Sequence, residues 1–212
     1  MARHLAKMIG DRYVDSGAMY RAVTLYAMRQ GMIAPDGTID KAALMKALPD
    51  IDIDFKVDGE RQLTTLNGET VEDEIRRMDV SNNVSPIAAI PEVRHRLVAL
   101  QQKFGREKGI VMDGRDIGTT VFPDAELKIY VNASAQTRAQ RRFKELCDNG
   151  VAATFEEVLA NVVHRDHIDM TREESPLRRA DDAIDLDNST MTPEEQNAWL
   201  LRLYEDKINS LK

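Results

Sequence analysis

The feature that most constrains this 212-residue chain is a short apolar run that breaks abruptly into charge and glycine. Residues 110–112 (Ile-Val-Met) are typical of a buried parallel strand, and Asp113-Gly114-Arg115-Asp116 follows at once. Ligands of α/β proteins bind beyond the carboxyl ends of such strands. Arg115 offers a planar fork of five donors that suits a phosphate, and Asp116 offers an acceptor beside it. On these residues alone, an Arg–Asp pair at a surface turn explains the pattern equally well.

The composition limits the classes of protein that this chain can belong to. Its length suits one domain, or one domain with an insert. A formal net charge of −7 argues against a nucleic-acid partner, because such proteins normally carry a basic face. Cys147 is the only cysteine, so no internal disulfide can form and a reducing compartment is favoured. No apolar run approaches the roughly 20 residues that span a bilayer, and no signal core opens the chain. We therefore expect a cytoplasmic monomer that has no membrane contact.

Most of the chain alternates predicted helices and strands in the manner of an α/β fold. Capping signals support two of the helix ends, because Gly150 follows one helix and Thr192-Pro193-Glu194-Glu195 opens another. The predicted elements outside the middle of the chain are a helix ending at residue 9, a strand at 12–14, a loop at 15–18, helices at 19–32, 41–48 and 91–104, a strand at 127–131, helices at 136–148 and 155–169, and a strand at 182–187.

Residues 49–85 follow a different pattern. Ile51 to Val57 alternates strictly between apolar and polar residues, which predicts a half-buried strand. Asp58-Gly59-Glu60 is a hairpin signal, and further short strands are predicted at 62–66 and 69–71. A helix at 72–78 and a break at Ser85-Pro86 complete the segment. We expect an inserted antiparallel β element here, because tight turns and alternating faces do not suit a parallel core.

A second group of arginines and carboxylates lies near the end of a predicted helix. Arg165, Asp169 and Arg172 are spaced i, i+4 and i+7, so they share one helix face. In isolation this spacing is also typical of a solvated, salt-bridged surface. Arg138, Arg141 and Arg142 come upstream, and phosphoryl transfer needs positioned positive charge. His164 and His167 flank the group, but no metal-ligand spacing accompanies them, so we predict no protein metal site.

Three motifs in the same order resemble those of bacterial cytidylate kinases. They are Asp15-Ser16-Gly17-Ala18-Met19-Tyr20-Arg21, then Asp113-Gly114-Arg115-Asp116-Ile117-Gly118-Thr119-Thr120-Val121-Phe122-Pro123, then Arg165-Asp166-x-x-Asp169-x-x-Arg172-x-x-x-Pro176-Leu177. The resemblance implies a P-loop, nucleoside-monophosphate-kinase-like parallel sheet flanked by helices, formed by residues 1–48 and 86–212. Residues 49–85 would be the inserted nucleoside-monophosphate-binding region, and residues 138–172 a lid. The implied reaction transfers a phosphoryl group from ATP to CMP or dCMP, giving CDP or dCDP, with Mg²⁺ accompanying ATP.

The resemblance also assigns roles to individual residues. It implies cytosine contacts from Ser16, Arg94 and Asp116, ribose contacts from Ser85, Arg165 and Asp169, and α-phosphate contacts from Arg21, Arg115 and Arg172. Arg172 could instead serve the base. Arg138 and Arg142 would close over the ATP phosphates. The implied catalytic residues are therefore Arg115, Arg138, Arg142 and Arg165.

The chain departs from the family at one motif. Members of the family begin with a strand and a Gly-x-x-x-x-Gly-Lys-Ser/Thr loop whose backbone N–H groups cradle the ATP phosphates. No such run occurs in these 212 residues, and residues 1–7 align with the helix just after that loop. We therefore expect the first strand and the P-loop to be absent, the parallel sheet to be interrupted at its centre, and this form to be truncated and to have little activity. The alternative is a catalytically inactive CMP-binding or regulatory protein.

Overall fold

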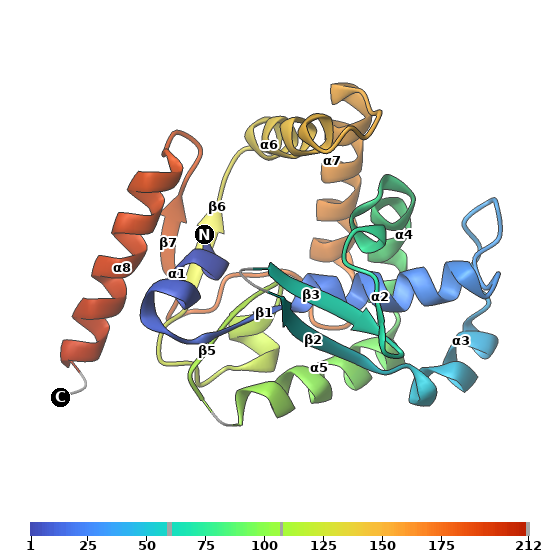
Figure 1. Cartoon of the computed structure of the whole chain (residues 1–212), viewed down its shortest axis with the longest axis horizontal. Helices are drawn as coiled ribbons and strands as arrows, with labels where there is room; N and C mark the ends of the chain where they lie inside the picture. The colour runs from blue at the N-terminus through green and yellow to red at the C-terminus, as the bar shows by residue number, and fades with distance from the viewer. Residues whose placement is uncertain (59–60, 107, 211–212) are drawn as a thin grey trace.

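The computed structural model describes residues 1–58, 61–106 and 108–210, and its α/β core contains two pairs of parallel strands (Figure 1). Strand β1 (Arg12–Asp15) pairs with β5 (Ile110–Asp113), and β6 (Ile129–Asn132) pairs with β7 (Ile184–Asp187). Each pair is a separate two-stranded sheet. The α/β class with parallel strands flanked by helices is confirmed, and so is the predicted interruption of the parallel sheet.

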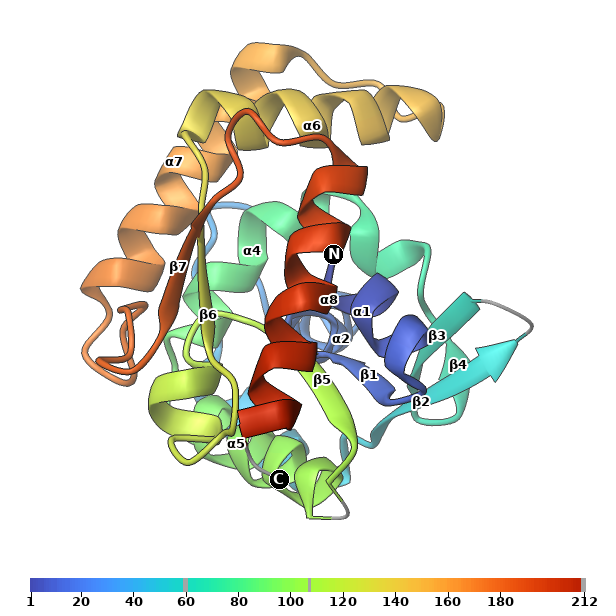
Figure 2. The ribbon, with the colours of Figure 1, turned by 90° about the vertical axis from the view of Figure 1, so that its left-hand side faces the viewer.

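The described helices surround these strands. Helix α1 (Ala2–Ile9) packs against β1, β5 and α8 (Pro193–Ser210), and Figure 2 shows α1 and α8 side by side. The predicted cap of α8 is confirmed, because Thr192 and Glu195 each accept a hydrogen bond from the other's backbone N–H. None of the helices in the described part of the chain is long and apolar enough to cross a membrane. Their bounds are α1 (Ala2–Ile9), α2 (Ser16–Arg29), α3 (Lys41–Ala47), α4 (Met78–Ala88), α5 (Pro91–Gly105), α6 (Ala135–Asp148), α7 (Phe155–Thr171) and α8 (Pro193–Ser210).

The main hydrophobic core is built around α2. Met19 and Val23 of this helix are fully buried, together with Ile87 of α4 and Val93 of α5. Burying side chains of this size contributes roughly 1.5–3 kcal/mol each, so α2 is held firmly between its neighbours. This packing matters for the site because α2 begins directly at the end of β1.

The middle segment forms the expected antiparallel sheet. Strands β2 (Ile53–Asp58), β3 (Arg61–Leu66) and β4 (Glu69–Thr70) lie in the order β2-β3-β4. Ile53 and Phe55 of β2 are buried against the main core, whereas Val57, the next apolar side chain in the alternation, is 79% exposed. Residues 59 and 60 of the predicted hairpin signal lie outside the described residues.

Two predictions around the ends of β1 and β4 are wrong. Residues 15–18 are not a loop, because the Asp15 carboxylate accepts a hydrogen bond from the Ala18 N–H at 2.9 Å and caps α2. The predicted helix at 72–78 is reduced to a single 3₁₀ turn, Glu74–Arg76. The Glu72 carboxylate instead accepts hydrogen bonds from the Thr64 N–H and hydroxyl at 3.0 and 2.6 Å, which ties this segment to β3.

The predicted break at Ser85-Pro86 is also wrong. Helix α4 runs through Pro86 and ends only at Ala88. A proline inside a helix removes one backbone hydrogen bond and crowds the preceding turn. Burial of Val80, Val84 and Ile87 along the same helix offsets this cost.

Helices α6 and α7 form a hairpin that stands above the rest of the molecule (Figure 1). The hairpin has its own small apolar cluster, in which the rings of Phe143 and Phe155 meet edge to face with centroids 6.3 Å apart. Helix α7 also packs against α4. The carboxyl end of α7 descends toward the core, whereas α6 lies across the top of the molecule (Figure 1).

Candidate functional site

The site begins where β1 and β5 end side by side. Ser16, the first residue of α2, donates a hydrogen bond from its hydroxyl to the Asp113 carbonyl at 2.6 Å. Gly114 makes this approach possible, because a Cβ at that position would lie 2.2 Å from the Ser16 hydroxyl and 2.9 Å from Ile117. The glycine of the Asp-Gly-Arg-Asp run is thus required by close packing at the floor of the site.

A buried cluster of charged groups lies next to this floor. Arg94 of α5 donates to Asp116, and their side chains are only 1% and 5% exposed. Arg172, at the end of α7, lies 3.8 Å from the same carboxylate. A π-helical turn, Ile117–Val121, follows Asp116 and directs backbone N–H groups at its carbonyl. Burial and the neighbouring Arg94 lower the pKa of Arg172.

Asp169 connects this cluster to Arg115. Its carboxylate lies 3.5 Å from Arg172 and accepts a hydrogen bond from the Arg115 Nε at 3.1 Å. Asp169 is buried, whereas the side chain of Arg115 is 43% exposed. The second predicted arginine group is therefore no solvated helix face, and its members converge on the Asp-Gly-Arg-Asp segment.

A second set of arginines lies close together beside this cluster, and few carboxylates balance the positive charge of the set. Burial lowers the pKa of Arg21 to about 9, helped by the positive charges of Arg165, Arg76 and Arg142. Burial likewise lowers the pKa of Arg165 to about 10, with Arg115 and Arg142 adding repulsion. Such a concentration of like charge favours the binding of an anion.

The hairpin arginines have distinct partners. Arg138 holds Asp166 in a two-pronged ion pair at 2.9 and 2.6 Å. Arg142 reaches across to the backbone carbonyl of Arg76 at 2.6 Å. Arg141 binds Asn188 and is structural. Both side chains also form ion pairs within the hairpin, Arg138 with Asp166 and Arg142 with Glu145 at 2.8 Å, but Arg142 in addition lies beside Arg21 and Arg165.

Sequence reasoning missed two groups that support the site. Arg76 joins Asp15 at 2.7 Å to Glu72 at 2.8 Å, and so connects the middle segment to the end of β1. Ser81 of α4 accepts a hydrogen bond from Arg165 at 3.3 Å and donates one to Asn161 at 3.2 Å. Apart from the Arg76–Glu72 pair, whose members are four residues apart, these contacts join residues far apart in the chain, so no local pattern marks them. Ser85, one turn further along α4, is 2% exposed.

A pair of carboxylates lies at the ends of the paired strands. Asp15 is opposite Asp113 in the β1–β5 register, and Tyr13 donates to both Asp113 oxygens at 3.0 and 3.2 Å. Loss of bulk water around the carboxylate, together with the charge of Asp15, raises the pKa of Asp113 to about 6. No group of three His, Cys, Asp or Glu side chains suitable for a metal occurs among the described residues.

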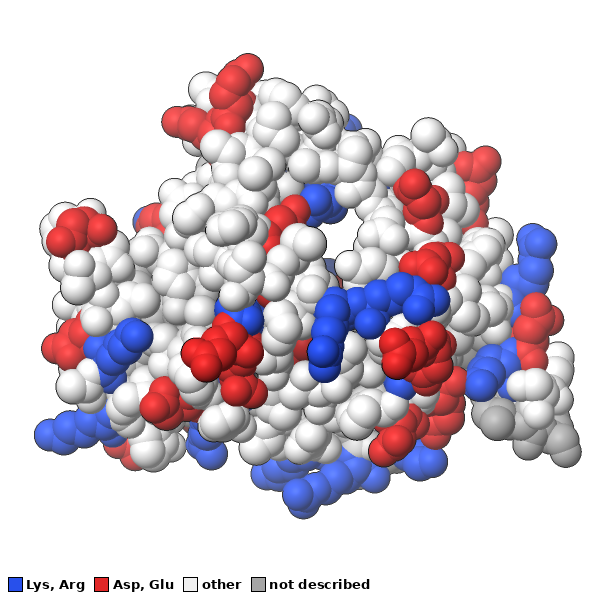
Figure 3. All heavy atoms as spheres, turned by 180° about the vertical axis from the view of Figure 1, so that it is seen from behind, with Lys and Arg blue, Asp and Glu red and all other residues white. Residues whose placement is uncertain are grey.

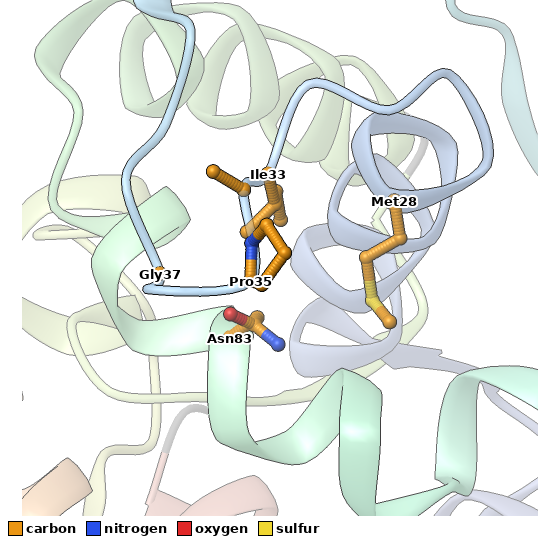
Figure 4. Close-up of a pocket in the computed structure, with 6 residues that line it drawn as sticks. Met28, Ile33, Pro35, Gly37 and Asn83 are labelled. Atoms are coloured by element: carbon orange, nitrogen blue, oxygen red, sulfur yellow. The ribbon is translucent and has the colours of Figure 1, made fainter.

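One face of the molecule is hollowed. Seen from behind, an opening lies beneath the hairpin, with basic side chains above and below it (Figure 3). A separate cavity of about 300 Å³ lies between the end of α2 and α4, where Met28, Ile33 and Asn83 are among its lining residues (Figure 4). Its lining residues carry no charge, so this cavity does not suit a phosphate group.

Comparisons with known proteins agree with this geometry. The family model described as cytidylate kinase matches residues 1–206. The chain belongs to the cytidylate kinase family. It is 58% identical over 212 residues to the cytidylate kinase of Bacteroides fragilis, a match that covers 99% of this chain and 92% of that protein. It is 58% identical over 211 residues to the cytidylate kinase of Phocaeicola vulgatus and 54% identical over 213 residues to that of Porphyromonas gingivalis, with the same coverage.

Membership of the cytidylate kinase family confirms the resemblance predicted from the three motifs. These enzymes are nucleoside monophosphate kinases, and the parallel strands flanked by helices suit a nucleotide kinase fold. The candidate residues of all three motifs meet in one place, because Ser16, Arg115, Asp116, Asp169 and Arg172 surround the ends of β1, β5 and α7.

Proposed function

We propose that this chain binds CMP or dCMP as phosphate acceptor and transfers a phosphoryl group to it from ATP. The observation that carries the proposal is the buried Arg94–Asp116–Arg172 cluster beside an excess of arginines. A polar base needs fixed donors and acceptors, and a phosphate needs positive charge. Both requirements are met within one site.

Asp116 and Arg94 suit the recognition of cytosine. A carboxylate accepts a hydrogen bond from the exocyclic amine of cytosine, and a guanidinium donates to the ring acceptors. Uracil carries a carbonyl oxygen in place of the amine, which the Asp116 carboxylate would repel. Ser16, whose hydroxyl lies at the start of α2, is the third proposed base contact.

The remaining contacts follow from the charges around the site. We assign the ribose to Ser85, Arg165 and Asp169, and the α-phosphate to Arg21, Arg115 and Arg172. Positive charge on that phosphate lowers the repulsion between it and the incoming γ-phosphoryl group. Arg115 and Arg165 are therefore the proposed catalytic residues on the acceptor side, and residues 49–85 are the proposed nucleoside-monophosphate-binding insert.

The donor side is proposed to use the hairpin. Arg142 already lies beside Arg21 and Arg165, and Arg138 would reach ATP only by exchanging its contact with Asp166. Mg²⁺ bound with ATP would neutralise phosphate charge. The Asp15–Asp113 carboxylates suit a cation that takes one or two protein oxygens and shares the rest with nucleotide phosphates.

The donor side also limits the expected rate. The 212 residues contain no Gly-x-x-x-x-Gly-Lys-Ser/Thr run, so the backbone cradle and lysine that such a run supplies have no counterpart in this sequence. We propose that these 212 residues bind CMP but turn over slowly. A coupled assay that detects CDP at ordinary kinase rates, of about 1–100 s⁻¹, would contradict this proposal.

The decisive experiment compares CMP with UMP by calorimetry. The unmutated chain should prefer CMP by roughly ten- to a hundred-fold, since leaving buried polar groups unpaired costs about 1–3 kcal/mol. Asp116→Ala should lose this preference, whereas Arg115→Ala should weaken both nucleotides alike, because a phosphate contact does not read the base. Equal affinity for CMP and UMP in the unmutated chain would refute the proposed base site.

A second function remains the alternative if phosphoryl transfer fails. Selective CMP binding without turnover would favour the inactive CMP-binding or regulatory protein, because the arginine cluster would then act only in binding. A monomeric state and a cytoplasmic location stay predictions. Gel filtration with light scattering tests the first, and fractionation of cells tests the second.

A further inference from the structure

A chain of hydrogen bonds between α4 and α7 ends at the Arg165 guanidinium. The Ser81 hydroxyl accepts a hydrogen bond from the Arg165 Nη1 at 3.3 Å and donates one to the Asn161 Oδ1 at 3.2 Å. The Asn161 Nδ2 donates to the Ser81 carbonyl at 3.4 Å and to the Asn82 Oδ1 at 2.8 Å. A carbonyl can only accept, so the nitrogen of the Asn161 amide is the atom that faces it. The amide oxygen is then left to take the Ser81 proton, and the lone pairs of that hydroxyl are turned toward Arg165.

The rest of the Arg165 guanidinium has no hydrogen bond. In the described part of the chain Ser81 is its one hydrogen-bond partner, and its Nε is buried and has none. Buried polar atoms are nearly always paired, because leaving one unpaired costs stability. Asp169, one turn further along α7, does not supply the missing acceptor, because its carboxylate is engaged by Arg115 at 3.1 Å and Arg172 at 3.5 Å. The Nε therefore calls for an acceptor that a ligand brings.

The spacing of these residues places the network beside the residues assigned to the ribose. Asn161, Arg165 and Asp169 follow one another at intervals of four on α7, so they share one face of that helix. Ser81 and Ser85 are four apart on α4 and share a face in the same way. The two helices pack against each other, and Ser81 is 2% exposed. Ser81 and Asn161 thus lie one turn away from Ser85 and Arg165 on the same pair of helix faces.

We infer that Ser81 and Asn161 are positioning residues through which Arg165 distinguishes CMP from dCMP. This inference rests on the proposed function, which assigns the ribose to Arg165, and it extends that assignment to one hydroxyl of the sugar. The 2′-hydroxyl of ribose accepts hydrogen bonds and is absent from deoxyribose. Ser81 fixes one end of the guanidinium, so the Nε keeps the orientation in which it donates to this hydroxyl. With dCMP the same buried donor stays unpaired, which disfavours dCMP.

The test measures the affinities of CMP and dCMP by calorimetry on the full chain. The unmutated chain should bind CMP more tightly than dCMP by about fivefold or more, as one hydrogen bond allows. Ser81→Ala removes the hydroxyl that holds Arg165, so it should weaken CMP by about fivefold while leaving the affinity for dCMP almost unchanged. Asn83→Ala is the control, because Asn83 also lies on α4 but donates to the Asp79 carbonyl at 2.9 Å. It should change neither affinity.

A double-mutant cycle tests whether Asn161 acts through Ser81. Asn161→Ala leaves the Ser81 hydroxyl free to turn its proton toward Arg165, so this variant should also lower the ratio of CMP to dCMP affinity. If the two residues act in one chain, the double variant should lose no more of this ratio than Ser81→Ala alone. Losses that add would overturn the inferred role of Asn161.

The outcomes separate the inference from the proposed function. If the unmutated chain binds CMP and dCMP equally, or if Ser81→Ala keeps the full preference, the inference is overturned while the proposed function stands. Equal weakening of both nucleotides by Ser81→Ala also overturns it, because a merely structural role or a contact with the 3′-hydroxyl would act on both. If the unmutated chain binds neither nucleotide, the proposed function fails and the inference with it. If Ser81→Ala does not fold, Asn161→Ala alone decides: a lower ratio supports the inference, and an unchanged ratio overturns it.

Discussion

Asp116→Asn isolates the electrostatic role of the buried cluster, because it keeps the shape of the side chain and removes its charge. In the unmutated chain this carboxylate balances Arg94 and lies 3.8 Å from Arg172, and all three side chains are at most 5% exposed. The variant would leave two guanidinium groups buried with less counter-charge. Removing one partner of a buried ion pair typically costs about 3–5 kcal/mol.

This cost is large enough to measure by thermal or urea unfolding without any ligand. For a chain of this length, about 1 kcal/mol shifts the midpoint by roughly 2–4 °C, so a fall of roughly 6–20 °C is expected. The matched control is Asp185→Asn, which makes the same change in the exposed Arg179–Asp185 pair. Exposed pairs contribute less than about 1 kcal/mol, so the control should shift the midpoint only slightly.

The two variants together test whether burial is what makes the loss of one ion-pair partner costly. Equal shifts in Asp116→Asn and Asp185→Asn would refute it, because burial would then make no difference. A double variant, Arg94→Met with Asp116→Leu, provides a second check. It should be more stable than Asp116→Asn alone, since it removes a charge pair together instead of stranding one partner.

Three further predictions concern the edges of the site. Desolvation raises the pKa of Asp113 from 3.8 to about 6, so the folded state holds its proton more tightly and stability falls as the pH rises from about 4 to 6. Asp113→Asn should therefore be more stable than the unmutated chain at pH 7, and urea midpoints should converge as the pH falls through that window; a constant difference would contradict this. Gly114→Ala should lose about 1–3 kcal/mol of stability, since its Cβ would meet the Ser16 hydroxyl at 2.2 Å, and an unchanged urea midpoint would refute the clash. Asn161→Ala should weaken CMP binding by roughly fivefold through Arg165, as one lost hydrogen bond allows, and calorimetry would contradict this if the affinity stayed the same.

The local patterns of the sequence predicted the elements that carry the site. The apolar run at 110–112 is a strand, and the polar residues after it lie at the end of the strand, where ligands of α/β folds bind. The alternation along 51–57 likewise predicted an antiparallel strand. Such signals succeed because burial on one or both faces of a strand imposes its own periodicity on the sequence.

The failures occur where a distant contact overrides a local rule. Pro86 normally ends a helix, yet apolar residues on both sides of it are buried against α2 and keep α4 continuous. The polar run from Asp15 predicts a loop, although an aspartate before Ser-Gly-Ala also suits a helix cap, which is its role in the structure. The role of Arg76 cannot be predicted from the sequence, because its partner Asp15 is 61 residues away at the end of β1.

The pairing of β1 with β5 also determines when the chain can complete its candidate site during synthesis. Tyr13 and Asp113, which meet across this pair, are 100 residues apart. At roughly 5–20 residues per second, a ribosome takes roughly 5–20 s to make the intervening chain. The pairing of β2 with β3 joins residues close in sequence, so this hairpin can form long before β5 emerges. A ligand of the candidate site can therefore assist folding only late, after Arg172 has left the ribosome, and until β5 is made the edge of β1 that pairs with it stays unpaired.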